Sequence, residues 1–171
     1  ARLDPVKDHP GFLQAAALVA ARIPQVRFAC VGDGPPAYRA ELARQAAALG
    51  LAERLIWAGE RHNMADVHNA FDLLCLASRT EGFPNVIAEA MASARPCVAT
   101  RVGDVAEIIG DAGLTVPPAA PAELAQALLD LLARPEPARQ RLGLQARHRV
   151  SELYSLEAMV AGTEEALRQL V

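Results

Sequence analysis

Residues 78–92, Ser-Arg-Thr-Glu-Gly-Phe-Pro-Asn-Val-Ile-Ala-Glu-Ala-Met-Ala, decide how this 171-residue chain is organised. They follow a short apolar run at 73–77, which predicts a buried strand, and they open with a glycine loop at 79–83. Pro84 stands where the first turn of a helix tolerates proline, and the apolar spacing predicts a helix over 84–93. The stretch therefore predicts a strand, a loop and a helix whose first N–H groups point at the carboxyl end of the strand.

Apolar runs and helical patterns alternate along the rest of the chain in the same way. The expected strands are continuous apolar runs, which is typical of a parallel sheet covered by helices on both faces. We expect strands at 26–31, 55–58, 73–77, 97–100 and 114–116, and helices at 12–23, 38–49, 64–71, 84–93, 106–109, 121–133, 136–150 and 155–170. The sequence predicts one α/β domain over residues 1–171, whose helical C-terminus ends on an apolar stripe of Leu156, Met159, Val160, Thr163 and Leu167.

The composition is that of a soluble globular protein, with 52% apolar and 22% charged residues. The net charge of −3 provides no basic field that would recruit nucleic acid or an anionic membrane. No apolar run approaches the roughly 20 residues of a membrane span. Cys30, Cys75 and Cys97 each lie in a short apolar stretch, so we expect buried free thiols and a reducing, cytoplasmic setting.

The histidines show no metal-ligand spacing, so no metal site is expected. We expect His9 and His62 on surface loops and Trp57 in the core. For Arg79, at the edge of the expected cleft, a solvated or salt-bridged role and a contact with a bound phosphate or with the acceptor remain open.

Residues 1–3, Ala-Arg-Leu, look like the tail of a strand whose beginning is absent. A sheet that starts at the last residues of a strand lacks something upstream. We therefore expect that the chain was trimmed from a longer protein, while removal of an initiator methionine remains the alternative.

Ligands of open parallel sheets bind outside the carboxyl ends of the strands. The loops expected at that edge are 2–9, 32–36, 59–63, 78–85 and 100–105. A helix that starts there is a ready anion site, and Gly82 lets the backbone come close to a ligand. Glu81 in the loop and Glu89 in the helix would flank a bound phosphate, as a nucleotide-sugar requires. On spacing alone, a capping role for Glu81 and a solvated Glu89 remain open.

The pair Glu81 and Glu89 resembles the Glu-x7-Glu signature of the retaining GT-B glycosyltransferases of group 1, also called family 4. The sequence Glu-Gly-Phe-Pro-Asn, followed by Glu-Ala-Met-Ala, is highly specific to that family. Three further segments are similar to it: Arg2-Leu3 with Lys7, Val31 to Pro35, and Pro96 to Glu107. Departures include Asp8 and Asp104, which stand where family members often have glycine. The resemblance implies a Rossmann-like parallel sheet, the C-terminal half of a GT-B fold.

The resemblance also implies a role for each site residue. Glu89 would bind the ribose of the donor, and Glu81 would hold the transferred sugar. Arg2 and Lys7 would neutralise the diphosphate, which is the leaving group, so Glu81, Arg2 and Lys7 form the expected catalytic set. The other expected donor contacts come from backbone groups or loops, at Gly32, Gly34, Arg61, Gly82, Phe83, Pro84 and Asn85. No divalent metal or other cofactor is implied, because cationic side chains and the helix dipole can carry the charge.

The expected function is that of the donor-binding domain of an enzyme that moves a sugar from a nucleotide diphosphate to an acceptor hydroxyl. Its partners would be the nucleotide-sugar and an absent N-terminal acceptor domain, without which the fragment is expected to be inactive. Membrane contact is expected only through that absent half. A nucleotide-binding module without catalysis and a nucleotide-sugar epimerase of related architecture remain open. A dinucleotide-dependent dehydrogenase is disfavoured, because no strand runs into Gly-x-Gly-x-x-Gly.

Overall fold

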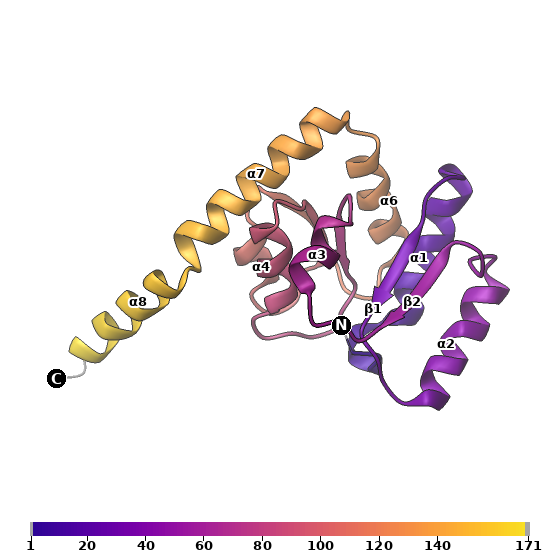
Figure 1. Cartoon of the computed structure of the whole chain (residues 1–171), viewed down its shortest axis with the longest axis horizontal. Coiled ribbons are helices and arrows are strands. Elements are labelled where there is room, and N and C mark those ends of the chain that lie inside the picture. The colour runs from indigo at the N-terminus through magenta and orange to yellow at the C-terminus, as the bar shows by residue number, and fades with distance from the viewer. Residues whose placement is uncertain (1, 170–171) are drawn as a thin grey trace.

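The computed structural model describes residues 2–169. Within them, parallel strands alternate with helices (Figure 1). The strands are β1 (Phe28–Val31), β2 (Leu55–Gly59), β3 (Leu74–Leu76), β4 (Cys97–Thr100) and β5 (Gly113–Val116). The helices are the 3-10 turn η1 (Pro5–Lys7), α1 (His9–Arg22), α2 (Pro36–Ala48), α3 (Met64–Asn69), α4 (Asn85–Ala92), α5 (Val105–Ile109), α6 (Pro121–Leu132), α7 (Glu136–Leu153) and α8 (Leu156–Arg168). The alternation predicted from the sequence is confirmed.

The strands form two parallel sheets, whereas the sequence suggested a single one. β1 pairs with β2, and β3, β4 and β5 pair in that order. Within residues 2–169 no ladder joins β1 to β3. Paired strands lie about 4.8 Å apart, but here a cavity separates β1 from β3. The sequence of a strand does not show which other strand pairs with it, so the division into two sheets could not be predicted.

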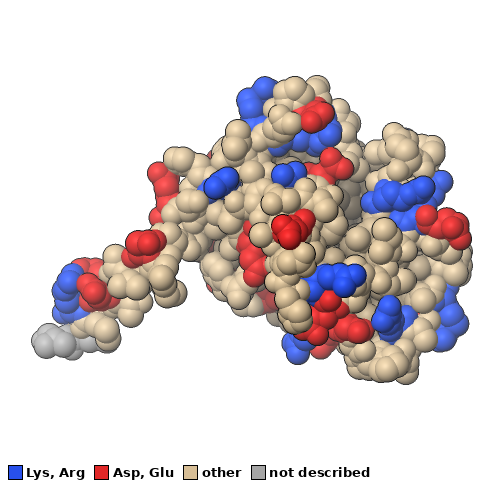
Figure 2. Space-filling model, in the orientation of Figure 1, with Lys and Arg blue, Asp and Glu red and all other residues tan. Residues whose placement is uncertain are grey.

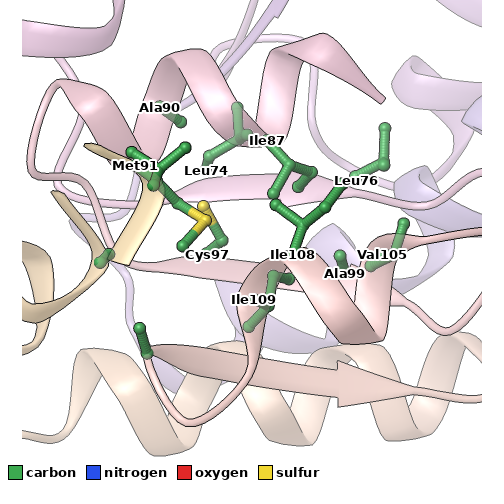
Figure 3. Packing of buried hydrophobic residues seen from close by; sticks show 13 residues of the cluster. Leu74, Leu76, Ile87, Ala90, Met91, Cys97, Ala99, Val105, Ile108 and Ile109 are labelled. Atoms are coloured by element: carbon green, nitrogen blue, oxygen red, sulfur yellow. The ribbon is translucent and has the colours of Figure 1, made fainter. Parts of the chain in front are cut away.

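Helices cover both faces of the three-stranded sheet, as the apolar strand runs predict. Along β4 the side chains alternate between two clusters of buried residues. Cys97 and Ala99 contribute to a cluster with α4, α5 and α7, which Figure 3 shows around Met91 and Ile108. Val98 points to the opposite face, into a cluster with α1 and α6. Buried free cysteine is confirmed at Cys97, while Cys30 and Cys75 are free and half-buried.

A third cluster joins α1, α2 and β2, and it includes Leu3 of the N-terminal segment. Leu3 is 2% exposed, so this segment is anchored in the core. Trp57 packs against the same cluster but is only half-buried, which differs from its expected place inside the core. β2 is an edge strand, and the side chain before Trp57, Ile56, is exposed.

The apolar stripe of α8 is not buried. α8 begins after a Ser155 cap, whose Oγ accepts from Ala158 N at 3.1 Å, and it extends away from the two sheets (Figure 1). The large apolar side chains of the stripe are all exposed: Leu156, Met159, Val160 and Leu167. Helical spacing predicted the helix correctly, but it does not show what would cover the apolar side. Within residues 2–169, no helix has the length and apolar character needed to cross a bilayer.

Candidate functional site

The loops that follow the strands meet at one edge of the molecule, as predicted. Residues 2–8 run between the ends of the two sheets: Leu3 N donates to Asp33 O beyond β1 (2.9 Å), and Arg79 N beyond β3 donates to Val6 O (2.8 Å). Asp104 N, beyond β4, donates to Gly82 O at 3.1 Å. Backbone hydrogen bonds thus connect segments that are far apart in the sequence. The result is a continuous edge built from the carboxyl ends of the strands.

Lys7 and Glu81 form an ion pair at the centre of this edge. Lys7 Nζ lies 2.7 Å from Glu81 Oε1, and their side chains are 19% and 11% exposed. Ser78 Oγ donates to the same oxygen at 2.6 Å. Partial burial strengthens charge-assisted hydrogen bonds, so the Glu81 carboxylate is firmly held. Two of the three residues predicted to be catalytic, Lys7 and Glu81, are therefore in contact although they lie 74 residues apart in the sequence.

Ser78 and Thr100 are site residues that the sequence did not single out. Both are almost completely buried, and Thr100 Oγ1 donates to Ser78 O at 2.6 Å. This bond ties the end of β4 to the end of β3. Ser78 opens the Glu81 loop, and its small polar side chain directly after a buried strand is the one local sign of its role.

Gly103 shapes the Glu81 loop from the neighbouring segment. Its φ is +50°, and a Cβ built there would lie 2.3 Å from Glu81 O and 2.4 Å from Gly82 O. Only glycine lets the two backbones approach so closely. A Cβ at Gly82, in contrast, would meet nothing within 4 Å. The space beside Gly82 is therefore open, whereas the space beside Gly103 is filled by backbone atoms.

The start of α4 faces the same edge. Its N-cap is Pro84, and among the described residues no side chain caps it. Ile87 N donates to Pro84 O at 3.0 Å, so the N–H groups of α4 that could meet an anion are those of Asn85 and Val86. Pro84 is buried and Asn85 exposed. Phe83 is 43% exposed and packs against Tyr154 with the rings tilted by 59° and their centroids 5.4 Å apart, so its side chain holds the loop against the C-terminal end of α7.

Glu89 lies on α4 beside His68 of α3. His68 Nε2 is 3.4 Å from Glu89 Oε2, and the side chains are 1% and 48% exposed. Nδ1 of His68 is buried without a hydrogen-bond partner among the described residues. Glu89 is thus half-exposed, with one oxygen next to a buried imidazole. The sequence gave no reason to connect His68 with Glu89, since they lie on different helices.

Asp8 and His9 are both buried at the start of α1, which the sequence did not predict. Asp8 is 4% exposed; its carboxylate accepts from Gly11 N at 3.3 Å at the start of α1 and pairs with Arg79 Nη2 at 3.2 Å. In this structure Arg79 therefore forms a salt bridge, one of the roles that the sequence left open.

The prediction that His9 lies on a surface loop is wrong, because α1 begins at His9 and buries it to 7% exposure. Burial lowers the pKa of His9 to about 4. His62 is exposed, as predicted.

The remaining predicted residues lie on the outer part of the edge. Gly34 accommodates the N-terminal segment, because a Cβ there would lie 2.4 Å from Leu3 O. Gly32 has a φ of 126° and donates to Gly59 O at 2.8 Å. Arg2 precedes Leu3 and is exposed, and Arg61 is exposed in the loop after β2. Both glycines thus have structural reasons to be glycine.

Charges around this edge are mixed in sign. Figure 2 shows acidic and basic side chains side by side over the described residues of the viewed face, without an extended area of one sign. Within residues 2–169, no three His, Cys, Asp or Glu side chains are grouped so that they could hold a metal ion. The cations and N–H groups at this edge suit a small anionic ligand that also presents hydroxyl groups.

Comparison with known proteins shows which family the chain resembles in sequence. The family model described as "Glycosyl transferases group 1" matches residues 1–134. The chain is 30% identical over 161 residues to N-acetyl-alpha-D-glucosaminyl L-malate synthase of Bacillus anthracis, covering 93% of this chain and 41% of that protein. It is 34% identical over 151 residues to alpha-D-kanosaminyltransferase of Streptomyces kanamyceticus, covering 86% and 38%. The chain therefore spans about two fifths of the length of these relatives.

Solved structures show the same fold. HepE of Anabaena, solved in complex with UDP, superposes with a TM-score of 0.88 at 27% identity, over 99% of this chain and 47% of that one. The C-terminal domain of the group 1 family protein LpcC from Francisella tularensis superposes with a TM-score of 0.79 at 24% identity, over 91% and 83%. The latter similarity concerns the fold alone.

Proposed function

The chain belongs to the group 1 glycosyltransferases, and from this premise we propose that it is the donor-binding part of a retaining enzyme. The complete enzyme would move a sugar from a nucleotide diphosphate to an acceptor hydroxyl. The observation that carries the proposal is the Lys7–Glu81 ion pair beside the uncapped start of α4, with Glu89 further along that helix. This places a cation, N–H donors and two carboxylates along one edge.

The order of these groups matches the order of parts in a nucleotide-sugar. The diphosphate would lie at the start of α4, where N–H groups and the helix dipole favour negative charge. Glu89 lies four residues after Asn85, about 6 Å along the helix axis, and would accept hydrogen bonds from the ribose hydroxyls. Glu81 would accept hydrogen bonds from the transferred sugar, in the open space beside Gly82.

Lys7 would change partners when the donor binds. Without ligand its ammonium group pairs with Glu81. A diphosphate at the start of α4 would offer a second anion, and Lys7 and the exposed Arg2 would stabilise the charge that develops as it leaves. Glu81 would then be released toward the sugar hydroxyls. We expect this set of cations and N–H groups to serve without a divalent metal.

UDP is the first nucleotide to test, because HepE of Anabaena is solved with UDP and with UDP-glucose. Calorimetry on the chain with UDP, GDP and ADP should show weak binding of at least one of them. Glu89→Ala should weaken binding by about 1–3 kcal/mol, the usual loss for hydrogen bonds to charged groups. Glu123→Gln, an exposed change on α6, is the matched control. Absence of binding at millimolar concentration for all three would refute the proposal.

The assignment of Glu81 and Lys7 needs the complete enzyme. Glu81→Gln should leave nucleotide affinity nearly unaltered and lower turnover strongly, because the sugar is held most tightly in the transition state. Lys7→Ala and Arg2→Ala should weaken both. Equal losses of nucleotide affinity in Glu81→Gln and Arg2→Ala would contradict the proposed order along the edge. Binding without turnover would indicate a non-catalytic module, and release of an epimerised sugar would indicate an epimerase.

A further inference from the structure

Two ion pairs, not one, join the segment that carries Lys7 to the loop that carries Glu81. Lys7 Nζ lies 2.7 Å from Glu81 Oε1, and Arg79 Nη2 lies 3.2 Å from Asp8 Oδ1. Each segment supplies one cation and one anion, so the two pairs cross-link the segments in opposite directions. A backbone hydrogen bond, from Arg79 N to Val6 O at 2.8 Å, joins the same two segments.

Asp8 is held firmly in the second ion pair. Its side chain is 5% exposed, and the oxygen that pairs with Arg79 also accepts from Gly11 N at 3.3 Å, at the start of α1. Its backbone N–H donates to Pro5 O at 3.1 Å. A buried carboxylate that loses its cation is strongly destabilised. The Arg79–Asp8 pair is therefore expected to stay closed, although the Arg79 side chain is 62% exposed.

The backbone of Asp8 has a conformation that glycine would adopt more easily. Its φ and ψ are both 47°, in the left-handed region, which is unfavourable for a residue with a Cβ. Such conformations persist where the surroundings enforce them, and they cluster at functional sites. The carboxylate is what glycine would lack at this position, and it bonds to the start of α1 and to Arg79.

The first ion pair opens in the proposed mechanism, when Lys7 turns from Glu81 to the diphosphate. Glu81 then remains held, because Ser78 Oγ donates to the same carboxylate oxygen at 2.6 Å. The Lys7 segment remains joined to the Glu81 loop through Arg79, whose backbone and side chain both bond to it. The second ion pair can thus keep the segments together while Lys7 changes partners.

We propose that Asp8 and Arg79 are positioning residues for Lys7: their ion pair is permanent, and the Lys7–Glu81 pair is the one that exchanges. This inference rests on the proposed function. The permanent pair keeps the ammonium group of Lys7 within reach of both Glu81 and a diphosphate at the start of α4, without touching the donor. Because the segment is ordered before the donor arrives, less conformational freedom is lost on binding.

Lys7 is the only lysine among the 171 residues, so its acetylation by acetic anhydride, read by peptide mass spectrometry, reports on this segment without any ligand. Asp8→Asn keeps an oxygen for the α1 cap and tolerates the left-handed backbone, but removes the charge. Asp8→Asn and Arg79→Ala should each speed acetylation about threefold, as expected for loss of one partly exposed ion pair. Arg168→Ala is the matched control, since Arg168 Nη2 also lies 3.2 Å from a carboxylate, on α8, and it should have no effect.

The two variants change the charge near Lys7 in opposite directions. Faster acetylation in both therefore reports a looser segment and not an electrostatic effect on the amine. Acceleration in Asp8→Asn alone, or in neither variant, would overturn the proposal.

Calorimetry with the tightest binder among UDP, GDP and ADP tests the link to the donor. Asp8→Asn and Arg79→Ala should each weaken binding about threefold, and Arg79→Lys should recover most of the loss. In a chain that already carries Lys7→Ala, Arg79→Ala should have no further effect, because it acts through Lys7. An effect that persists there would overturn the proposal, since Arg79 would then contact the nucleotide itself. If Lys7→Ala alone leaves the affinity unaltered, the proposed function fails, and acetylation still decides whether Asp8 and Arg79 hold Lys7.

Discussion

The two sheets are built from similar sequences but are buried to different extents. In β4, Cys-Val-Ala-Thr, every residue is buried, whereas in β1, Phe-Ala-Cys-Val, every residue is only half-buried. Both strands are continuous apolar runs. β4 has a paired strand on each side, while β1 has β2 on one side and the cavity on the other. An apolar run thus predicts a strand, but its neighbours decide how deeply the strand is buried.

The residues of the candidate site also come from different parts of the molecule. Ser78, Glu81 and Glu89 are carried by the three-stranded sheet and α4. Lys7 belongs to the N-terminal segment, which lies between the sheets and contacts the loop after β1 through Leu3. The three-stranded sheet and α4 therefore supply the carboxylates, and the segment that bridges the two sheets supplies the cation. Each prediction below compares a position on one side with a matched position on the other, or tests the boundary between them.

The largest effect is expected from removing core volume on the well-packed side. Ile109→Ala, at a position with 0% exposure beside the three-stranded sheet, should lower the free energy of unfolding by about 3–5 kcal/mol. Ile56→Ala removes the same atoms from β2, where the side chain is 59% exposed, and should cost less than about 1 kcal/mol. Urea unfolding measures both. Similar losses would mean that the two sheets are equally well packed in solution.

A somewhat smaller effect is expected at the glycine that shapes the Glu81 loop. Gly103→Ala introduces a Cβ against Glu81 O at a positive φ and should destabilise the fold by about 2–3 kcal/mol. Gly82→Ala is the matched change in open space and should cost less than about 0.5 kcal/mol. Thermal unfolding compares the two. If Gly82→Ala proves the more destabilising, the space beside it is not open.

Local features of this protein were predictable, and contacts between distant segments were not. The helix expected at 84–93 is α4, Asn85–Ala92, because proline placement and apolar spacing act over a few residues. The shared edge also followed from the sequence, since parallel strands end on the same side. Lys7 and Glu81 are 74 residues apart. They were expected to belong to the same site, but the ion pair between them was not predicted. The division of the sheet and the burial of His9 depend on packing that no local pattern records.

His9 lines the cavity between the two sheets, so the pH dependence of the free energy of unfolding tests how deeply this position is buried. Its pKa is lowered by burial to about 4, from 6.5 when unfolded. Between these values the unfolded state binds more protons, so stability should fall as the pH drops from about 6.5 to 4 and level off below that. After allowance for partial hydration, we expect His9 to account for about 1–2 kcal/mol of this loss.

Chemical unfolding at a series of pH values measures this slope. His9→Gln removes the titrating group and should flatten the slope over that range, whereas His62→Gln, at an exposed position, should leave it unchanged. A slope that persists in His9→Gln would show that other groups cause it.

The smallest effect is expected at His68, on the helix that follows the two-stranded sheet and contacts α4. Its Nε2 lies 3.4 Å from Glu89, so under the proposed function it would orient the carboxylate that binds ribose without touching the nucleotide. His68→Phe keeps an aromatic ring in the buried site and should weaken nucleotide binding by about 1 kcal/mol, the value of one modest hydrogen bond. A positioning role requires that this loss vanish when Glu89 is already alanine. Calorimetry on the two single variants and the double variant therefore gives a coupling energy: a value near zero would mean that His68 only fills space, whereas a coupling of about 1 kcal/mol would show that α3 controls the site on α4.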